Sequence, residues 1–226
     1  VGSEMCIRDR LKSSYNFVPG IMGMIFILIC AIMTSVSIVS EKEKGTMDLL
    51  LVSPVSPRTI IFGKLVPYFL LSCIILALML VMSYTLLEIP LSAAIFNVVW
   101  VTVLYVVLSL SLGLLISTLV DTQLAALIIS AIVCMIPIIM FSGMIFPIDN
   151  MPEALQWFSC IIPARWYVAA MRKLMIQQLP LTYIFKEVII LAAMTLLIIT
   201  VAIKKFNKSK SVSYTHLRAH ETVLDL

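Results

Sequence analysis

Long apolar runs alternate with short polar segments along most of this chain. Five runs are long enough to cross a membrane as helices, since about 20 residues rising about 1.5 Å each span a hydrocarbon core of about 30 Å. The fifth run is short, so Ile184 and Phe185 must join it while Lys186 reaches the interface. The pattern predicts an all-α integral membrane protein, a polytopic helical bundle with five transmembrane helices. The predicted spans are residues 21–39, 65–87, 97–119, 124–144 and 184–203.

The segment between the fourth and fifth predicted spans, residues 146–183, is more than a simple loop. Pro152 and Pro163 suit the first positions of two short helices. Apolar residues mixed with tryptophan, tyrosine and arginine are typical of the headgroup region. We therefore predict a short external helical hairpin. The alternative is a globular cap, but the segment is too short and too apolar to form a core alone.

The densest charge cluster between the spans is Ser40–Thr46, which reads SEKEKGT. Ser40 and Glu43 have the spacing of a capping box, which predicts that a new short helix begins there. The two prolines at 54 and 57 would end that helix. We predict a loop, residues 40–64, that offers an amphipathic helix to a partner outside the lipid; a plain solvated loop is the alternative. The apolar face of the helix would comprise Met47, Leu50 and Leu51.

Composition supports the membrane assignment and narrows the function. The chain of 226 residues is 62% hydrophobic and 12% charged, whereas soluble domains carry about 25% charged residues. Its net charge of +4 is small and spread over the ends and one loop, so no nucleic-acid partner is predicted. The five cysteines show no paired spacing, and His216 and His220 have no third ligand nearby, so no metal site is predicted.

The chemistry missing from the predicted spans also limits the function. Between Leu65 and Ile148 the charged residues are Glu88 and Asp121, both at span ends. Proton or ion relays require ionisable groups inside the membrane, so an ion-coupled carrier is not expected. The chain has no phosphate-binding loop and no hydrolase motif, so we predict no catalytic residue and no cofactor bound by this chain.

The distribution of lysine and arginine predicts the orientation, because cytoplasmic segments are enriched in both. With five spans, the loop 40–64 and the C-terminus lie on one side, predicted to be cytoplasmic, and the segment 146–183 lies outside. Three cations in that outer segment oppose the rule but are fewer: Arg165, Arg172 and Lys173. The cations on the predicted cytoplasmic side are Lys42, Lys44, Arg58, Lys64, Lys204, Lys205, Lys208 and Lys210.

Two further features concern packing and the chain ends. Ser109, Gly113 and Ser117 repeat every four residues, which lets helix backbones approach closely. The repeat suits packing within one subunit, and a transport path or a dimer contact is the alternative. Residues 1–10 and 211–226 resemble translated sequencing-adapter sequence, so we expect them to be non-native and residues 11–210 to form one transmembrane domain.

Two groups of residues carry a resemblance to a known family. The first group is Val18-Pro19-Gly20, Glu41–Thr46, Leu49-Leu50 and Ser53-Pro54. The second group is Phe141-Ser142-Gly143, Phe146-Pro147, Met151-Pro152, Leu155 and Pro163. Over about residues 12–208 the chain resembles the permease subunit of ABC-2 type exporters. The family has an additional first span, often followed by an external domain, and the chain lacks both, which predicts N-terminal truncation.

The resemblance implies a permease that moves substrate outward across the cytoplasmic membrane. It implies six spans per full subunit, a second permease as homo- or heterodimer partner, surrounding lipid, and cytoplasmic ATPase subunits that bind ATP and Mg. The expected ATPase-coupling residues are Glu41, Lys42, Glu43, Lys44, Gly45, Thr46, Met47, Leu50 and Leu51. The residues expected at an external gate or lid are Ser142, Gly143, Phe146, Pro147, Met151, Pro152 and Pro163. A non-transporting membrane scaffold or assembly protein is the alternative function.

Overall fold

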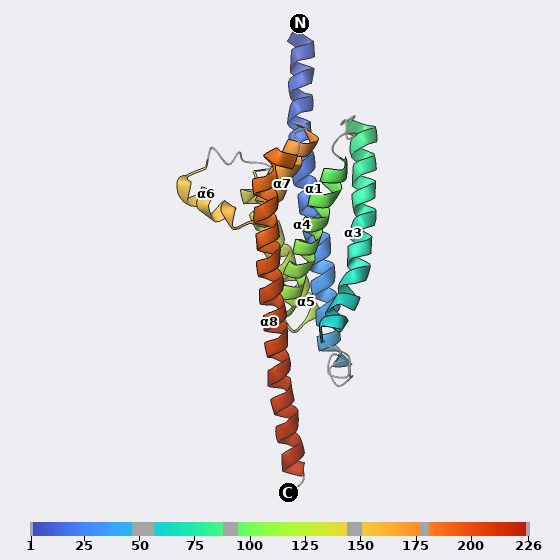
Figure 1. Ribbon diagram of the computed structural model, residues 1–226, viewed down its shortest axis with the longest axis vertical. Helices are drawn as coiled ribbons and strands as arrows, with labels where there is room; N and C mark the ends of the chain where they lie inside the picture. The colour runs from blue at the N-terminus through green and yellow to red at the C-terminus, as the bar shows by residue number, and fades with distance from the viewer. Residues whose placement is uncertain (1, 47–56, 88–94, 144–150, 177–180, 225–226) are drawn as a thin grey trace.

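A computed structural model shows the chain as a bundle of long helices (Figure 1). It describes residues 2–46, 57–87, 95–143, 151–176 and 181–224, and these ranges contain helices and turns but no strand. The predicted all-α class is confirmed. The elements are α1 (Gly2–Glu43), α3 (Pro57–Leu87), α4 (Ile95–Ser117), α5 (Gln123–Phe141), α6 (Glu153–Cys160), α7 (Pro163–Met175), the 3-10 turn η2 (Leu181–Tyr183) and α8 (Phe185–Leu224).

Five of the described helices are long and apolar enough to cross a membrane, as predicted. The first reaches Glu43, four residues beyond its predicted end at Val39, because the charged residues after the apolar run continue the same helix. The two end segments that we expect to be non-native continue α1 and α8 as helix. The membrane-length stretches are Phe17–Glu43, Phe62–Thr85, Ile95–Ser117, Gln123–Phe141 and Phe185–Lys205.

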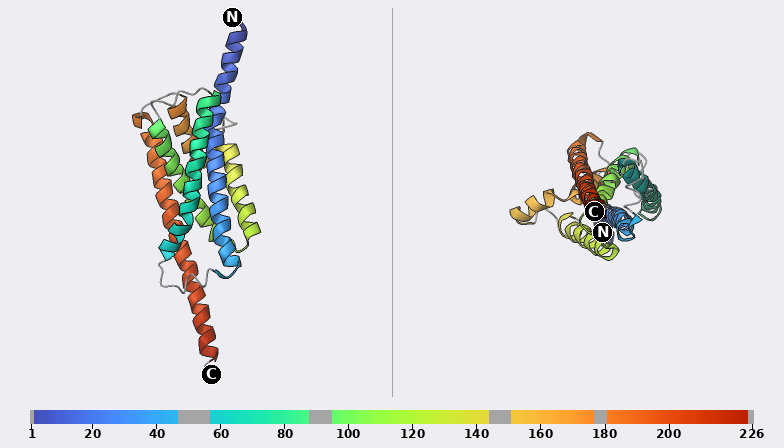
Figure 2. Two further views of the ribbon diagram at one scale, coloured as in Figure 1. Left: turned by 90° about the vertical axis from the view of Figure 1, so that its right-hand side faces the viewer. Right: turned by 90° about the horizontal axis from the view of Figure 1, so that it is seen from below.

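Helices α1 and α4 form the centre of the bundle, and α3, α5 and α8 surround them (Figures 1 and 2). Apolarity is nearly uniform around these helices, so close backbone approach rather than an apolar stripe decides how they pack. Gly113 shows this directly, because a Cβ there would lie 2.6 Å from the carbonyl oxygen of Ala31. Ser109 and Ser117 lie one turn before and one turn after Gly113 and are also buried.

The two short helices predicted within residues 146–183 are present, but α7 is more deeply buried than expected. Helix α6 extends sideways from the bundle, whereas α7 packs against α1, α4 and α8 (Figure 2). Pro163 is the first residue of α7, and Pro152 caps α6 instead of beginning it. The tyrosine that suggested a headgroup location, Tyr167, is fully buried. The reason is an apolar face on α7, formed by Ala164, Val168, Met171 and Leu174.

Two stacked tyrosines fix α7 in place. The rings of Tyr105 on α4 and Tyr167 on α7 are 4.1 Å apart between centroids and 12° from parallel. The Tyr105 hydroxyl donates to the carbonyl oxygen of Gly23 at 3.1 Å, and the Tyr167 hydroxyl shares a hydrogen bond with Thr102 at 3.2 Å. Aromatic stacking together with satisfied hydroxyls joins α1, α4 and α7.

Candidate functional site

The last turn of α1 contains the charge cluster singled out in the sequence. Ser40 lies inside α1, and its carbonyl oxygen accepts from the Lys44 amide at 3.2 Å. Gly45 then has φ +70°, a left-handed conformation that ends helices and favours glycine. The predicted capping box is therefore wrong, because Ser40 continues an existing helix instead of starting a new one.

Lys42 caps the C-terminal end of α4. Its Nζ donates to the carbonyl oxygens of Ser117 at 2.9 Å and Val120 at 3.2 Å, and lies 3.4 Å from Asp121 Oδ1. Ser117 is the last residue of α4, so its carbonyl has no partner within that helix. The Lys42 ammonium group thus binds carbonyl oxygens that have no partner within the helix, and its positive charge interacts favourably with the partial negative charge at the C-terminal end of α4.

Glu43 binds the N-terminal end of α5. Its Oε2 accepts from the backbone amide of Gln123, the first residue of α5, at 3.0 Å. Thr122 supports the same end of the helix, because its side chain accepts from the Ala125 amide at 3.3 Å. A carboxylate beside a helix N-terminus is stabilised by the exposed amides and by the dipole.

Glu41 forms an ion pair with Lys64 on α3, and both side chains are about three-quarters buried, with 25% and 23% exposed. Beneath the charges, Val39, Val120 and Ala126 form a buried apolar cluster. We call Glu41, Lys42 and Glu43 the α1 clamp. Three consecutive residues thus contact three different helices, α4 and α5 at their ends and α3 about two turns in from its start.

The clamp revises the expectation that these charges reach out to a partner. Glu41, Lys42 and Glu43 have partners within the chain, whereas Lys44 is exposed. Thr46 donates to the Glu41 carbonyl oxygen at 3.3 Å. The expected contact residues Met47, Leu50 and Leu51 lie outside the described residues.

Among the residues expected at a gate, the described ones lie just after α5 and at the starts of α6 and α7, away from the clamp. Ser142 follows the last residue of α5, and its amide donates to the Ile138 carbonyl oxygen at 3.1 Å. The carbonyl oxygen of Gly143 accepts from the Arg172 guanidinium at 3.1 Å. Burial lowers the pKa of Arg172. Where α6 begins, the carbonyl oxygen of Met151 accepts a hydrogen bond from the side-chain amide of Gln156 at 2.9 Å. Phe146 and Pro147 lie outside the described residues.

An ion pair at this opposite end, between a buried carboxylate and a one-third exposed lysine, was missed by the sequence reasoning. Lys173 Nζ lies 2.8 Å from Glu187 Oε1 and donates to the Tyr183 carbonyl oxygen at 3.3 Å. Glu187 is only 6% exposed, although it is near the start of a membrane-length helix. A sequence signal existed, since an acid at the beginning of an apolar run needs a cationic partner, and α7 supplies one.

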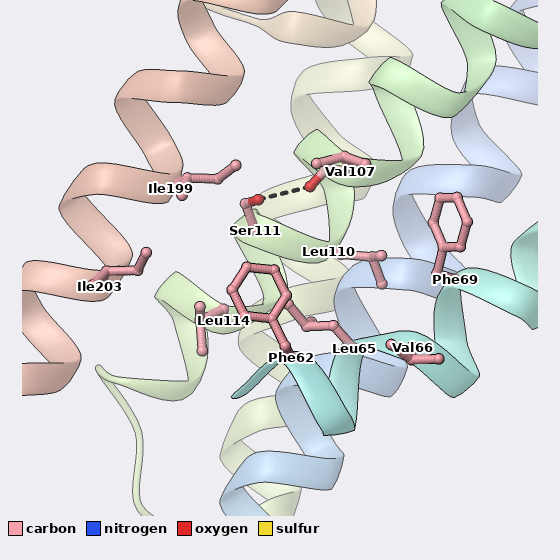
Figure 3. A pocket seen from close by; sticks show the side chains of 10 residues that line it. All are labelled: Phe62, Leu65, Val66, Phe69, Val107, Leu110, Ser111, Leu114, Ile199 and Ile203. Carbon is pink, nitrogen blue, oxygen red and sulfur yellow. Dashed lines mark hydrogen bonds between the residues drawn. The ribbon is translucent and has the colours of Figure 1, made fainter. Parts of the chain in front are cut away.

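A cavity of about 280 Å³ lies between α3, α4 and α8 (Figure 3). Its walls are almost wholly apolar, and the Ser111 hydroxyl donates to the Val107 carbonyl oxygen of its own helix at 2.7 Å. The cavity therefore suits hydrocarbon and lacks a polar group to orient a ligand. The lining residues are Phe62, Leu65, Val66, Phe69, Val107, Leu110, Ser111, Leu114, Ile199 and Ile203.

The residues that match a known protein family include both the clamp and the opposite end of the bundle. The family model described as ABC-2 family transporter protein matches residues 8–204, most of the chain. The chain belongs to the ABC-2 family of transporter proteins. All described residues of the α1 clamp, of the Lys173–Glu187 pair and of the cavity lie inside the match, and most of both end segments lies outside it.

Relatives of this ABC-2 family chain include permeases. It is 30% identical over 187 residues to a probable multidrug ABC transporter permease, YbhS, of Escherichia coli strain K12, covering 82% of the chain and 50% of that protein. Identity to the probable multidrug permease YbhR of the same organism is 30% over 189 residues, covering 82% and 51%. ABC transporter G family member 20 of Dictyostelium discoideum is 31% identical over 170 residues, covering 75% and 23%. The chain thus spans about half the length of the bacterial relatives.

Proposed function

We propose that the chain is a membrane-spanning permease part of an ATP-binding-cassette exporter, with ATP hydrolysed by a separate subunit. The observation that carries the proposal is the match to ABC-2 transporters over residues 8–204, on a chain with five membrane-length helices among its described residues. The proposed partners are a cytoplasmic ATPase that binds ATP and Mg, and a second permease, identical or different.

We propose that the end of the bundle carrying the α1 clamp faces the cytoplasm. Lys42, Lys44 and Lys64 lie at this end, and so do Lys204 and Lys205 on α8, which follow Ala202, a residue that packs with Ile38 of α1. An excess of cations on one side is typical of cytoplasmic segments. The opposite cations Arg172 and Lys173 have partners within the chain, Gly143 and Glu187 respectively. In this orientation the C-terminus lies in the cytoplasm, and the protein itself lies in the cytoplasmic membrane.

The proposed ATPase contact lies just beyond the clamp. Since Glu41, Lys42 and Glu43 serve the chain's own helices, the contact falls to Lys44 and to the apolar residues after Gly45. Those apolar residues are Met47, Leu50 and Leu51. An apolar face flanked by charge is a common way for one protein to bind a groove on another.

The substrate class proposed is small apolar or amphipathic compounds. Two relatives are named as probable multidrug permeases. The residues of the membrane-length stretches of α4 and α5 are uncharged, so a path along them would favour apolar solutes. The proposed direction of transport is outward.

Retention of the ATPase tests the proposal. The chain is co-expressed with a candidate cytoplasmic ABC ATPase and purified through a tag on the chain. The unaltered chain should retain the ATPase, and the triple variant Met47→Asp, Leu50→Asp and Leu51→Asp should lose it. The matched control places three aspartates on exposed α6 positions, Leu155, Trp157 and Phe158, and should retain it. Retention by the first triple variant would refute this contact, and no retention by the unaltered chain would refute the proposed function.

A further inference from the structure

The clamp residues match the charge that each neighbouring helix end presents. The C-terminal end of α4 exposes carbonyl oxygens and carries partial negative charge, and the N-terminal end of α5 exposes amides and carries partial positive charge. Lys42 lies at the former and Glu43 at the latter. A short turn, residues 118–122, joins these two ends. Adjacent residues of α1 therefore hold both sides of one turn with the signs that the helix dipoles require.

Two of the three clamp side chains are partly buried, whereas Glu43 is exposed. The Lys42 side chain is 21% exposed and the Glu41 side chain is 25% exposed. Exposed ion pairs contribute little, but partly buried charges that satisfy backbone groups at helix ends contribute more. The buried apolar cluster of Val39, Val120 and Ala126 packs the end of α1 against the turn and the start of α5.

Geometry allows one helix end to act on three neighbours. Successive residues of an α-helix point about 100° apart, so three in a row span about 200° around its axis and can face three different neighbours. Glu41 contacts α3, Lys42 contacts α4, and Glu43 contacts α5. Because α1 runs as one helix to Glu43 and the left-handed Gly45 follows, a displacement at this end reaches all three contacts together.

We propose that the α1 clamp transmits displacement of the end of α1 to α3, α4 and α5 at once, with Lys42 and Glu43 as positioning residues that hold the α4–α5 turn. The transmission rests on the proposed function, in which an ATPase moves this end of α1. The existence of the clamp does not rest on the proposed function, because the contacts that define the clamp lie within the chain.

Amide hydrogen exchange on the full chain in lipid nanodiscs tests the clamp without any ATPase. The swap Lys42→Glu with Glu43→Lys keeps composition and net charge but reverses both matches to the helix ends. We expect exchange in residues 118–125 to rise about tenfold, the effect of losing one charge-assisted hydrogen bond. Exchange in α6 and α7 should stay unchanged. An unchanged turn, or a uniform rise through the bundle, overturns the clamp.

Single substitutions give the test position-specific outcomes and remain informative if the swap does not fold. Lys42→Met should raise exchange at residues 118–121, Glu43→Ala at residues 123–126, and Glu41→Ala in the first turns of α3. The matched control is Lys205→Met, an exposed lysine at the same end of the bundle, which should change none of these. If all three variants raised amide exchange in the same residues, the claim that each clamp residue holds a different helix would be contradicted.

A fluorescent probe near the turn tests transmission. In a cysteine-free chain carrying Leu124→Cys, an exposed position on α5, MgATP added to the complex with the ATPase should change the probe signal. The swap should keep the ATPase bound but reduce that change at least about fivefold, the loss expected when a partly buried charge contact of about 1 kcal/mol is removed. An undiminished signal overturns transmission. If the unaltered chain binds no ATPase, both the proposed function and the proposed transmission are refuted. The amide-exchange experiment would still test whether the clamp contacts exist.

Discussion

The two ends of the bundle are held together by different physical means. At the clamp end, partly exposed charges reach backbone groups at helix termini, as in the Lys42 contact with Ser117. At the opposite end, α7 is held by stacked, fully buried tyrosines and by the buried Glu187. A partly exposed charge contact at a helix end contributes about 1 kcal/mol, whereas truncating a buried aromatic side chain costs about 3 kcal/mol or more. The comparison predicts that the α7 end is rigid and contributes more to stability than the clamp end.

Removing an aromatic ring from the rigid end gives the largest expected effect. Tyr167→Ala should lower the free energy of unfolding by at least about 3 kcal/mol, because truncating a buried aromatic side chain leaves a cavity. Equilibrium unfolding in mixed micelles measures it. The matched control is Tyr84→Ala, an exposed position on α3, and equal losses for both variants would contradict the assignment.

The buried ion pair at the rigid end should follow. Lys173→Met should cost about 3 kcal/mol, because it leaves the Glu187 carboxylate buried without its cation. Adding Glu187→Leu should recover most of the loss, since replacing both charges removes the unpaired one. The same unfolding assay measures both variants, with the exposed Lys186→Met as control. A double variant no more stable than the single one would show that the pair is not the cause.

Loss of charge at the clamp end should have a smaller effect on overall stability. Lys42→Met should lower the free energy of unfolding by about 1 kcal/mol, the scale of a cation at a helix C-terminus. Lys205→Met serves as the control in the same assay. A loss as large as that of Tyr167→Ala would remove the contrast between the two ends.

Salt should produce the smallest effect and should distinguish the ends without any substitution. Raising the salt concentration from 0.1 to 1 M shortens the screening length from about 10 Å to about 3 Å, which weakens partly exposed charges most. We expect amide exchange at residues 118–125 to rise about twofold, a change of a few tenths of a kcal/mol, while exchange in α7 stays constant. Equal changes at both ends would contradict the comparison.

Sequence alone could predict the membrane-length helices, because run length and the absence of charge determine them. It could not place α7, since the tyrosine and arginines that suggested a headgroup location are also suited to burial once partners are present. Tyr167 is stacked on Tyr105, and Arg172 binds the carbonyl oxygen of Gly143. Neither partner is near in sequence.

The clamp was hidden for a different reason. Lys42 and Glu43 bind backbone groups of Ser117 and Gln123, and a backbone carbonyl or amide has no signature in the sequence. The sequence did carry one positional signal. The third predicted span ends near Ser117 and the fourth begins near Gln123, and both of these ends are predicted to lie on the same side of the membrane as Lys42 and Glu43. The cavity, likewise, needs three helices in register before it exists.

Sidedness of the clamp end tests the central claim most directly, because an ATPase in the cytoplasm must reach it. In a cysteine-free chain, Lys44→Cys and Thr182→Cys place single thiols at two exposed positions at opposite ends. A membrane-impermeant maleimide should label Thr182→Cys in intact cells and Lys44→Cys only in inverted vesicles. Labelling of Lys44→Cys in intact cells would contradict the account.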